Sequence, residues 1–188
     1  MTVTFSARRL LVVLLALLLA CAALVAGSGH RGSGRAAAAG APGTVSCTGA
    51  SQGVITKGTV NGVVNTVAII VSSHGVTIPT DASTGSSTGK RVHRPYTFSK
   101  VTDASSVGLL KAMSLSENLT SCVFRYYVTK PDATISNYYT VTLGNAHLNA
   151  YSFSHSSTET EVWSLSYQTI KWQVGAVLFQ DSWSSPAV

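Results

Sequence analysis

Charged residues are scarce in this sequence: Lys, Arg, Asp and Glu together make up 11% of its 188 residues. The formal net charge of +6 is concentrated near the N-terminus, because four of the 13 Lys and Arg residues precede Gly40 and none of the seven acidic residues does. Residues 40–188 therefore carry nine basic (13 minus 4) and seven acidic side chains, a net charge of +2. A nearly neutral domain lacks the basic surface that nucleic acids require, so we expect no nucleic-acid partner.

Metal-binding and catalytic patterns are also missing. Four of the five histidines lie beyond residue 40, and none stands at metal-ligand spacing from a cysteine or another histidine. Glu159 and Glu161 would share one strand face, either as a carboxylate pair or, more often, as a solvated strand start, and no nucleophile motif accompanies them. We therefore predict no metal, no cofactor and no catalytic site. A small secreted hydrolase that uses these glutamates or a histidine is the weakest alternative.

The segment Gly85–Lys90 is similar to a phosphate-binding loop but does not match its pattern. Gly85–Lys90 has three residues between its glycines instead of four, and Arg91 replaces the hydroxyl residue that should follow the lysine. Pro95 then favours a strand where a helix is needed. These departures exclude nucleotide binding.

The N-terminus has the three parts of a secretory signal peptide. Arg8 and Arg9 precede an uncharged apolar run, Leu10–Val25, which small residues follow. At 16 residues the run is shorter than the roughly 20 that a spanning helix needs. We expect residues 1–39 to be a signal peptide and linker, cleaved near Ala39, so that a secreted domain at 40–188 keeps no membrane contact.

Two alternatives for the leader stay open. Small residues at Val25–Gly27 offer an earlier cleavage site. Leu18–Cys21 has the outline of a lipobox, in which Cys21 would carry a lipid and hold the protein at the cell envelope.

Beyond the leader, Ser, Thr, Gly, Val and Tyr dominate, which favours strands and turns. The unbroken apolar run Val64–Ser73 predicts a strand buried on both faces. Val92–Lys100 predicts a strand with Val92, Tyr96 and Phe98 on its apolar face, confined by Pro95 to an edge or a bulge.

Alternating apolar residues in Cys122–Lys130 and Tyr138–Ala146 predict an antiparallel hairpin. One helix is expected, over Ser105–Ser114, behind a Ser or Asp cap. The strand Glu161–Val174 changes the phase of its apolar positions, which indicates a bulge or a change of sheet. The fold class is therefore all-β: an antiparallel barrel or tightly curved sandwich of about seven or eight strands with one helix.

Several blocks between Gly53 and Trp183 resemble the Hcp family, the tube protein (haemolysin-coregulated protein) of type VI secretion systems, in order and spacing. They are Thr88–Lys100, the helix from Ser105, Glu117–Leu119, Tyr138–Ala146, Glu161–Trp172 and Asp181–Trp183. The resemblance implies an Hcp-like β-barrel without enzymatic activity, whose protomers form homohexameric rings that stack into tubes and accompany secreted effector proteins. Toxin domains extend some members; we expect no such extension here.

The leader departs from the family, whose typical members lack a signal peptide. A monomeric secreted β-barrel binding module that has lost the tube role is therefore the alternative to a ring-forming structural protein.

Thr80–Gly89 is a long polar loop that a neighbouring subunit would order, so the segment to Arg94 is expected among the subunit contacts. The candidate contact residues are Thr80, Asp81, Thr88, Gly89, Lys90, Arg91, His93, Arg94 and, near the C-terminus, Trp183. The histidines are otherwise expected to be solvated or to lie on edge strands.

Cys47 and Cys122 are the two cysteines beyond the leader. An oxidising compartment makes a disulfide between them plausible. The alternative is that Cys122 is an inert thiol on the apolar face of its strand.

Overall fold

The structure is a computed structural model that describes residues 41–184. The predicted signal peptide and linker at 1–39, with Cys21 and both cleavage sites, lie outside the described residues.

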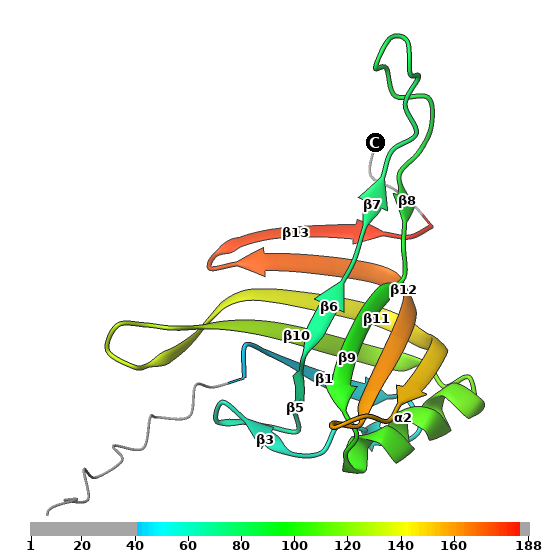
Figure 1. Cartoon of the computed structure of the whole chain (residues 1–188). Helices are drawn as coiled ribbons and strands as arrows, with labels where there is room; N and C mark the ends of the chain where they lie inside the picture. Colours follow the sequence, from blue (N-terminus) through cyan, green and yellow to red (C-terminus); the bar gives the residue numbers. More distant parts are fainter. Residues whose placement is uncertain (1–40, 185–188) are drawn as a thin grey trace, which may run out of the picture. The chain divides into compact units, whose positions relative to one another are not determined.

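One antiparallel sheet of nine strands forms the body of the domain (Figure 1). Its strands are β1 (Gly43–Gly49), β2 (Gly53–Val54), β5 (Val67–Ile69), β6 (Val71–Ser73), β9 (Tyr96–Val101), β10 (Leu119–Thr129), β11 (Ile135–Ser154), β12 (Thr160–Val174) and β13 (Val177–Ser182). The order is β2-β1-β10-β11-β12-β9-β6, with β5 paired to β1 and β13 to β12. Since β5 and β6 are nearly continuous in the chain, they join β1 to β9 and close the sheet into a barrel. The predicted all-β fold is confirmed.

Two small sheets flank the barrel. β3 (Thr59–Val60) pairs with β4 (Val63–Val64), and β7 (Val76–Thr77) pairs with β8 (Val92–His93).

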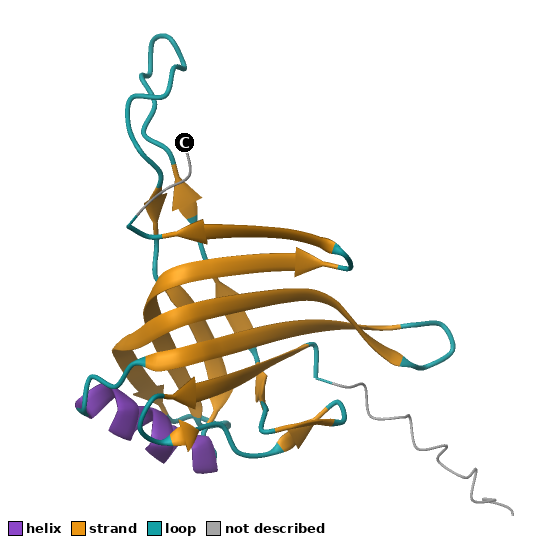
Figure 2. Cartoon of the chain, turned by 180° about the vertical axis from the view of Figure 1, so that it is seen from behind, coloured by secondary structure: helices purple, strands orange, loops and turns teal. Residues whose placement is uncertain are grey.

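The predicted helix is α2 (Ala104–Ser114), which lies at one end of the barrel (Figure 2). Asp103 caps it: the Asp103 carboxylate accepts from the backbone N–H of Ser105 at 2.7 Å, and the Ser106 hydroxyl accepts from the Asp103 N–H at 3.1 Å. Leu109 and Ala112 are buried on the face that packs on the barrel. The sequence pattern therefore located this helix to within one residue.

Aromatic side chains fill the barrel interior. Trp163 lies opposite Phe98 on neighbouring strands, and the Phe98 ring meets Phe124 edge-on with a centroid separation of 5.4 Å. In the predicted β10–β11 hairpin, Cys122 and Phe124 point inward, as their alternation predicted. Burial of these side chains is the main source of stability.

A buried ion pair ties the helix to the barrel wall. Lys100 on β9 is 0% exposed and its Nζ lies 3.0 Å from Oε2 of Glu161, which is 1% exposed. Ser106 on α2 donates to the same oxygen at 2.8 Å, and the Trp163 indole N–H donates to it at 3.1 Å. The two glutamates do not form a carboxylate pair: Glu159 is exposed, as expected at a solvated strand start, and lies 3.6 Å from His155, whereas Glu161 is buried.

The run Val64–Ser73 is not one strand buried on both faces. It is divided among β4, β5 and β6, and changes partner at Ile70, from β1 to β9. Val67 and Ile69 are buried, whereas Val71 is 61% exposed. The prediction is wrong because a barrel wall has solvent on its outer side, so alternate residues of the run leave the core.

The strand predicted over Val92–Lys100 is two strands, β8 and β9, separated by Pro95. Tyr96 and Phe98 point inward as predicted, but Val92 is 52% exposed and His93 is buried. Proline lacks the N–H for a continuous ladder, and the chain shifts phase there by one residue. This break places a histidine, instead of a valine, inside the domain.

The phase change in Glu161–Val174 corresponds to a change of neighbour. Residues 160–165 of β12 pair with β9, and residues 169–174 pair with β13. Tyr167 and Ile170, which stand on either side of the change, are both buried. Because β9 and β13 belong to the same nine-stranded sheet, the predicted change of sheet is wrong: the strand changes its neighbour within one sheet.

Candidate functional site

A hairpin made of β7, β8 and the loop between them projects beyond the barrel (Figures 1 and 2). Its loop has hydrogen bonds of its own: Thr80 and Ser87 form an isolated bridge, and the Thr88 N–H donates to the carbonyl of Pro79 at 2.9 Å. One Asp81 carboxylate oxygen accepts from the hydroxyl and backbone N–H groups of Ser83 and Thr84. These bonds, that of the Ser83 hydroxyl foremost, lower the pKa of Asp81 to about 2.

The loop thus has internal order in one chain. Its geometry therefore does not require a neighbouring subunit to order it.

The base of the hairpin is held by a cluster of polar and aromatic side chains, here called the anchor cluster. It comprises His74, Arg91, His93, Tyr167, Asp181 and Trp183. Arg91 Nη2 lies 2.6 Å from Asp181 Oδ1, and His93 Nε2 lies 3.1 Å from Asp181 Oδ2. The hairpin is therefore joined to β13, which follows it by more than eighty residues in the chain.

The hydrogen bonds of the anchor cluster have one consistent direction when both histidines are neutral. A carboxylate only accepts, so His93 Nε2 donates to Asp181, and His93 Nδ1 accepts from the Tyr167 hydroxyl at 3.0 Å. The Tyr167 oxygen then accepts from His74 Nε2 at 2.5 Å. The chain of bonds runs from His74 on the barrel to the Asp181–Arg91 ion pair.

Burial and charge set the protonation states of this chain. Burial raises the pKa of Asp181, but the Ser182 N–H and the Arg91 guanidinium outweigh it, and the pKa lies below its ordinary value. Burial, together with the positive charge that His93 would carry, lowers the pKa of His74. Burial and the Asp181 charge raise the pKa of the Tyr167 hydroxyl. These shifts keep the Asp181 carboxylate ionised, and the His74 ring and the Tyr167 hydroxyl neutral, at neutral pH.

The predicted contact residues are in part brought together. Thr80, Thr88, Gly89 and Lys90 are exposed on the projecting loop, Asp81 is partly exposed within it, and Arg94 is exposed at the base of the hairpin. Arg91, His93 and Trp183 meet in the anchor cluster, where the Trp183 ring stacks on His93 with centroids 5.9 Å apart.

His93 is a correction to that set. Its side chain is 1% exposed, because the break at Pro95 turns it inward, so it cannot present itself to another subunit. The histidines were expected to be solvated or on edge strands: His93 lies on β8, an edge strand, but is buried, and His74 is half-buried. Sequence reasoning also missed Tyr167, His74 and Asp181 as a group; the one signal was the block Asp181–Trp183, whose partners are distant in sequence.

A second surface lies on β13. Within the described residues this strand pairs only with β12, so the backbone of its other edge is open. Val177, Leu178 and Phe179 are exposed along it, and Phe179 stacks on Trp172 with centroids 5.6 Å apart. An open edge with apolar side chains is a typical site of association with another chain.

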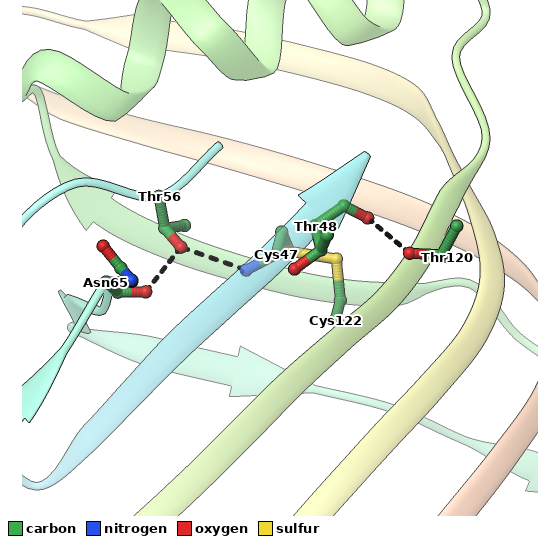
Figure 3. The surroundings of a disulfide bond; sticks show 6 residues. All are labelled: Cys47, Thr48, Thr56, Asn65, Thr120 and Cys122. Atoms are coloured by element: carbon green, nitrogen blue, oxygen red, sulfur yellow. Dashed lines mark hydrogen bonds between the residues drawn. A yellow bond between two sulfur atoms is a disulfide. The ribbon is translucent and has the colours of Figure 1, made fainter. Parts of the chain in front are cut away.

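The structure joins Cys47 and Cys122 by a disulfide between the neighbouring strands β1 and β10 (Figure 3). Both residues are fully buried. The Thr56 hydroxyl accepts from the Cys47 N–H at 3.1 Å and donates to the Asn65 carbonyl at 2.7 Å, which fixes the next segment of chain beside the bridge.

Residues 41–184 contain no group of three or more His, Cys, Asp and Glu side chains that could hold a metal ion. No helix in the same range is long and apolar enough to span a bilayer.

Comparison with known proteins identifies the family. Residues 52–174 match the family described as type VI secretion system effector, Hcp. The chain belongs to the Hcp family. The Major exported protein of Pseudomonas aeruginosa is 33% identical to it over 166 residues, covering 77% of this chain and 96% of that protein.

Solved Hcp structures share the fold. The secreted protein Hcp3 from Pseudomonas aeruginosa has a TM-score of 0.66 at 29% identity, covering 77% of this chain and 99% of the other. The Hcp1 protein from E. coli EAEC 042 has a TM-score of 0.69 at 26% identity, with coverages of 76% and 98%. The Hcp family match at 52–174 contains His74, His93 and Tyr167 but neither Cys47 nor Asp181.

Proposed function

We propose that this Hcp domain is a non-enzymatic structural subunit that assembles with copies of itself into rings outside the cytoplasm. Hexameric rings are the form that Hcp proteins take in structures, and ring or tube formation is the role known for the family. The observation that carries the proposal for this chain is the open, apolar edge of β13.

Ring closure needs two different patches on each subunit, because its interfaces are head-to-tail. The β13 edge supplies one candidate patch, with exposed Val177 and Leu178 and with backbone groups that pair with no other strand of residues 41–184. The projecting hairpin, with Thr80, Thr88 and Lys90 exposed, supplies a second and chemically different one. The anchor cluster fixes the orientation of the hairpin relative to β13, so that both patches keep a constant geometry. A net charge of +2 on residues 40–188 brings few like charges together on assembly.

We infer that the domain reaches the outside of the cell. A relative of 33% identity is named for its export, and Arg8, Arg9 and the apolar run after them have the form of a signal peptide. Mass spectrometry of the culture medium should find a species that begins between Ser28 and Thr44. Recovery of the full-length chain alone, inside the cell, would contradict this route. Secreted effectors are candidate passengers of such a ring.

A charged side chain introduced at the β13 edge tests the ring proposal. Leu178→Lys should reduce the particle to a single chain, because a buried charge at a subunit contact has no partner there. Val107→Lys is the matched control, since Val107 is exposed on α2 and away from both patches; it should leave the particle mass unchanged. Sedimentation velocity measures both, and circular dichroism checks that each variant is folded. A ring unaffected by Leu178→Lys would remove β13 from the interface.

The contribution of the loop is a separate measurement. Deletion of Thr80–Gly89 should weaken assembly while the barrel stays folded, because the loop makes its bonds within itself. A ring that survives the deletion intact would clear the loop of any part in the contact.

A further inference from the structure

A cavity of about 350 Å³ opens at the end of the barrel away from α2. Aromatic rings from four strands line it: Tyr96, Tyr126, Tyr138, Tyr139 and Trp172, with the imidazole of His74 beside them. The hydroxyls of Ser72 and Ser73 complete its polar part. The projecting loop and β13 contribute no residue to this lining, although Trp172 in the lining stacks on Phe179 of β13.

The hydroxyl groups of the cavity have unused hydrogen-bonding capacity. Ser72 and Tyr126 are bonded at 2.5 Å, and Tyr126 is also bonded to Tyr96. Two bonds among three hydroxyls use two of three donors, so one donor and several acceptor lone pairs remain. Within residues 41–184 the hydroxyls of Tyr138 and Tyr139 have no hydrogen-bond partner. The lining can therefore both donate to a ligand and accept from it.

The lining contains no lysine, arginine, aspartate or glutamate. An anionic ligand would find no cation there, and a cationic ligand would lose its hydration without gaining a counter-charge. Burial lowers the pKa of His74, so its ring supplies no charge at neutral pH either. The ligand that fits is therefore uncharged, carries many hydroxyl groups and has flat apolar faces to lie against aromatic rings.

A sugar ring has these properties, since its hydroxyls both donate and accept while its C–H faces stack on aromatic side chains. Tyr138 is 53% exposed at the rim, where its ring is accessible to a ligand. We propose that this cavity is a binding site for a neutral carbohydrate of one or two sugar units, either free or as part of a glycan chain.

The test is NMR titration of the purified protein with cellobiose, maltose and N,N'-diacetylchitobiose, observing the Trp172 indole and His74 ring signals. At least one sugar should shift these signals saturably. Tyr138→Phe keeps the ring but removes one hydroxyl, and should weaken binding about five-fold, the loss of one hydrogen bond. Tyr138→Ala also removes the stacking surface and should abolish binding. Tyr151→Phe is the control: Tyr151 packs on Trp163, outside the cavity, and this variant should bind as the unchanged protein does.

Retention of the protein on an insoluble glycan built from the disaccharide that binds would identify a surface polymer as the source of the ligand. Binding of the free disaccharide without retention on that glycan would identify a soluble sugar. The proposal is overturned if no sugar shifts the Trp172 signal, or if Tyr151→Phe weakens binding as much as Tyr138→Phe. It is also overturned if tetramethylammonium, a cationic probe, shifts the signal and the sugars do not. Light scattering on the same samples keeps this result separate from the ring, since a ring that binds no sugar contradicts the cavity proposal alone.

Discussion

The buried ion pair between Lys100 and Glu161 should dominate the stability of the contact between α2 and the barrel. Lys100 Nζ has four oxygen neighbours: Glu161 Oε2 at 3.0 Å, the Ser106 hydroxyl at 2.8 Å, Asp103 Oδ1 at 3.1 Å and the Val101 carbonyl at 3.0 Å. Glu161 is its fully buried counter-charge, whereas Asp103 is 36% exposed and so screened by solvent.

Glu161→Gln should therefore leave the Lys100 ammonium without an effective partner and lower the free energy of unfolding by about 3 kcal/mol. Lys100→Met leaves the Glu161 carboxylate buried with only the Ser106 and Trp163 donors, and should cost a similar amount. The double variant K100M/E161Q is neutral on both sides and keeps an acceptor for those donors. It should cost no more than either single change, so that the coupling energy is about 3 kcal/mol.

Urea unfolding followed by tryptophan fluorescence measures all four proteins, with equal m-values as the condition for comparing them. Glu159→Gln is the matched control, because the same change at an exposed carboxylate should have almost no effect. Two results would refute the reasoning: single changes whose costs simply add in the double variant, or a Glu161→Gln protein as stable as the Glu159→Gln control.

Three other expectations concern the bridge and the anchor cluster. Reduction of the Cys47–Cys122 bridge, which closes a loop of 75 residues, should lower the free energy of unfolding by about 4 kcal/mol in the chain-entropy model. Urea unfolding curves with and without reductant measure this loss. A control protein with alanine at both cysteine positions should not respond to the reductant. Since the pKa of His74 is lowered by burial from 6.5, the unfolded chain takes up the proton first as the pH falls, so stability should decline below about pH 6.5. His74→Phe should flatten that slope in a pH series of thermal melts, and an unchanged slope would assign it to another group. The pKa of Asp181 in the folded protein lies below 3.8, so the contribution of its carboxylate to stability is complete above that pH and is lost as the pH falls through the folded pKa. Asp181→Asn should increase hydrogen exchange at the base of the hairpin even at neutral pH. An unchanged exchange rate would contradict the role of the anchor cluster.

Short-range patterns predicted the elements whose neighbours are adjacent in the chain. The Ser or Asp cap before α2 and the alternation in β10 and β11 depend on residues a few positions apart, and both were predicted at the right place. The all-β class and the family also followed from the sequence, because blocks in the order and spacing of the Hcp family span most of the domain.

The errors have a common physical cause, which is that burial depends on partners distant in the sequence. His93 is buried because Pro95 shifts the strand phase and Asp181, 88 residues later, accepts a hydrogen bond from its ring. Lys100 faces the core because Glu161 and Ser106 come to it from β12 and α2. No local pattern distinguishes such a lysine from a solvated one, so neither the ion pair nor the anchor cluster could be located before the strand order was known.

Multi-angle light scattering of the exported protein, over a wide range of concentration, tests the central claim most directly. The account predicts a particle of about six times the mass of one chain, as expected for a closed ring of Hcp subunits. A mass equal to one chain at every concentration would contradict it.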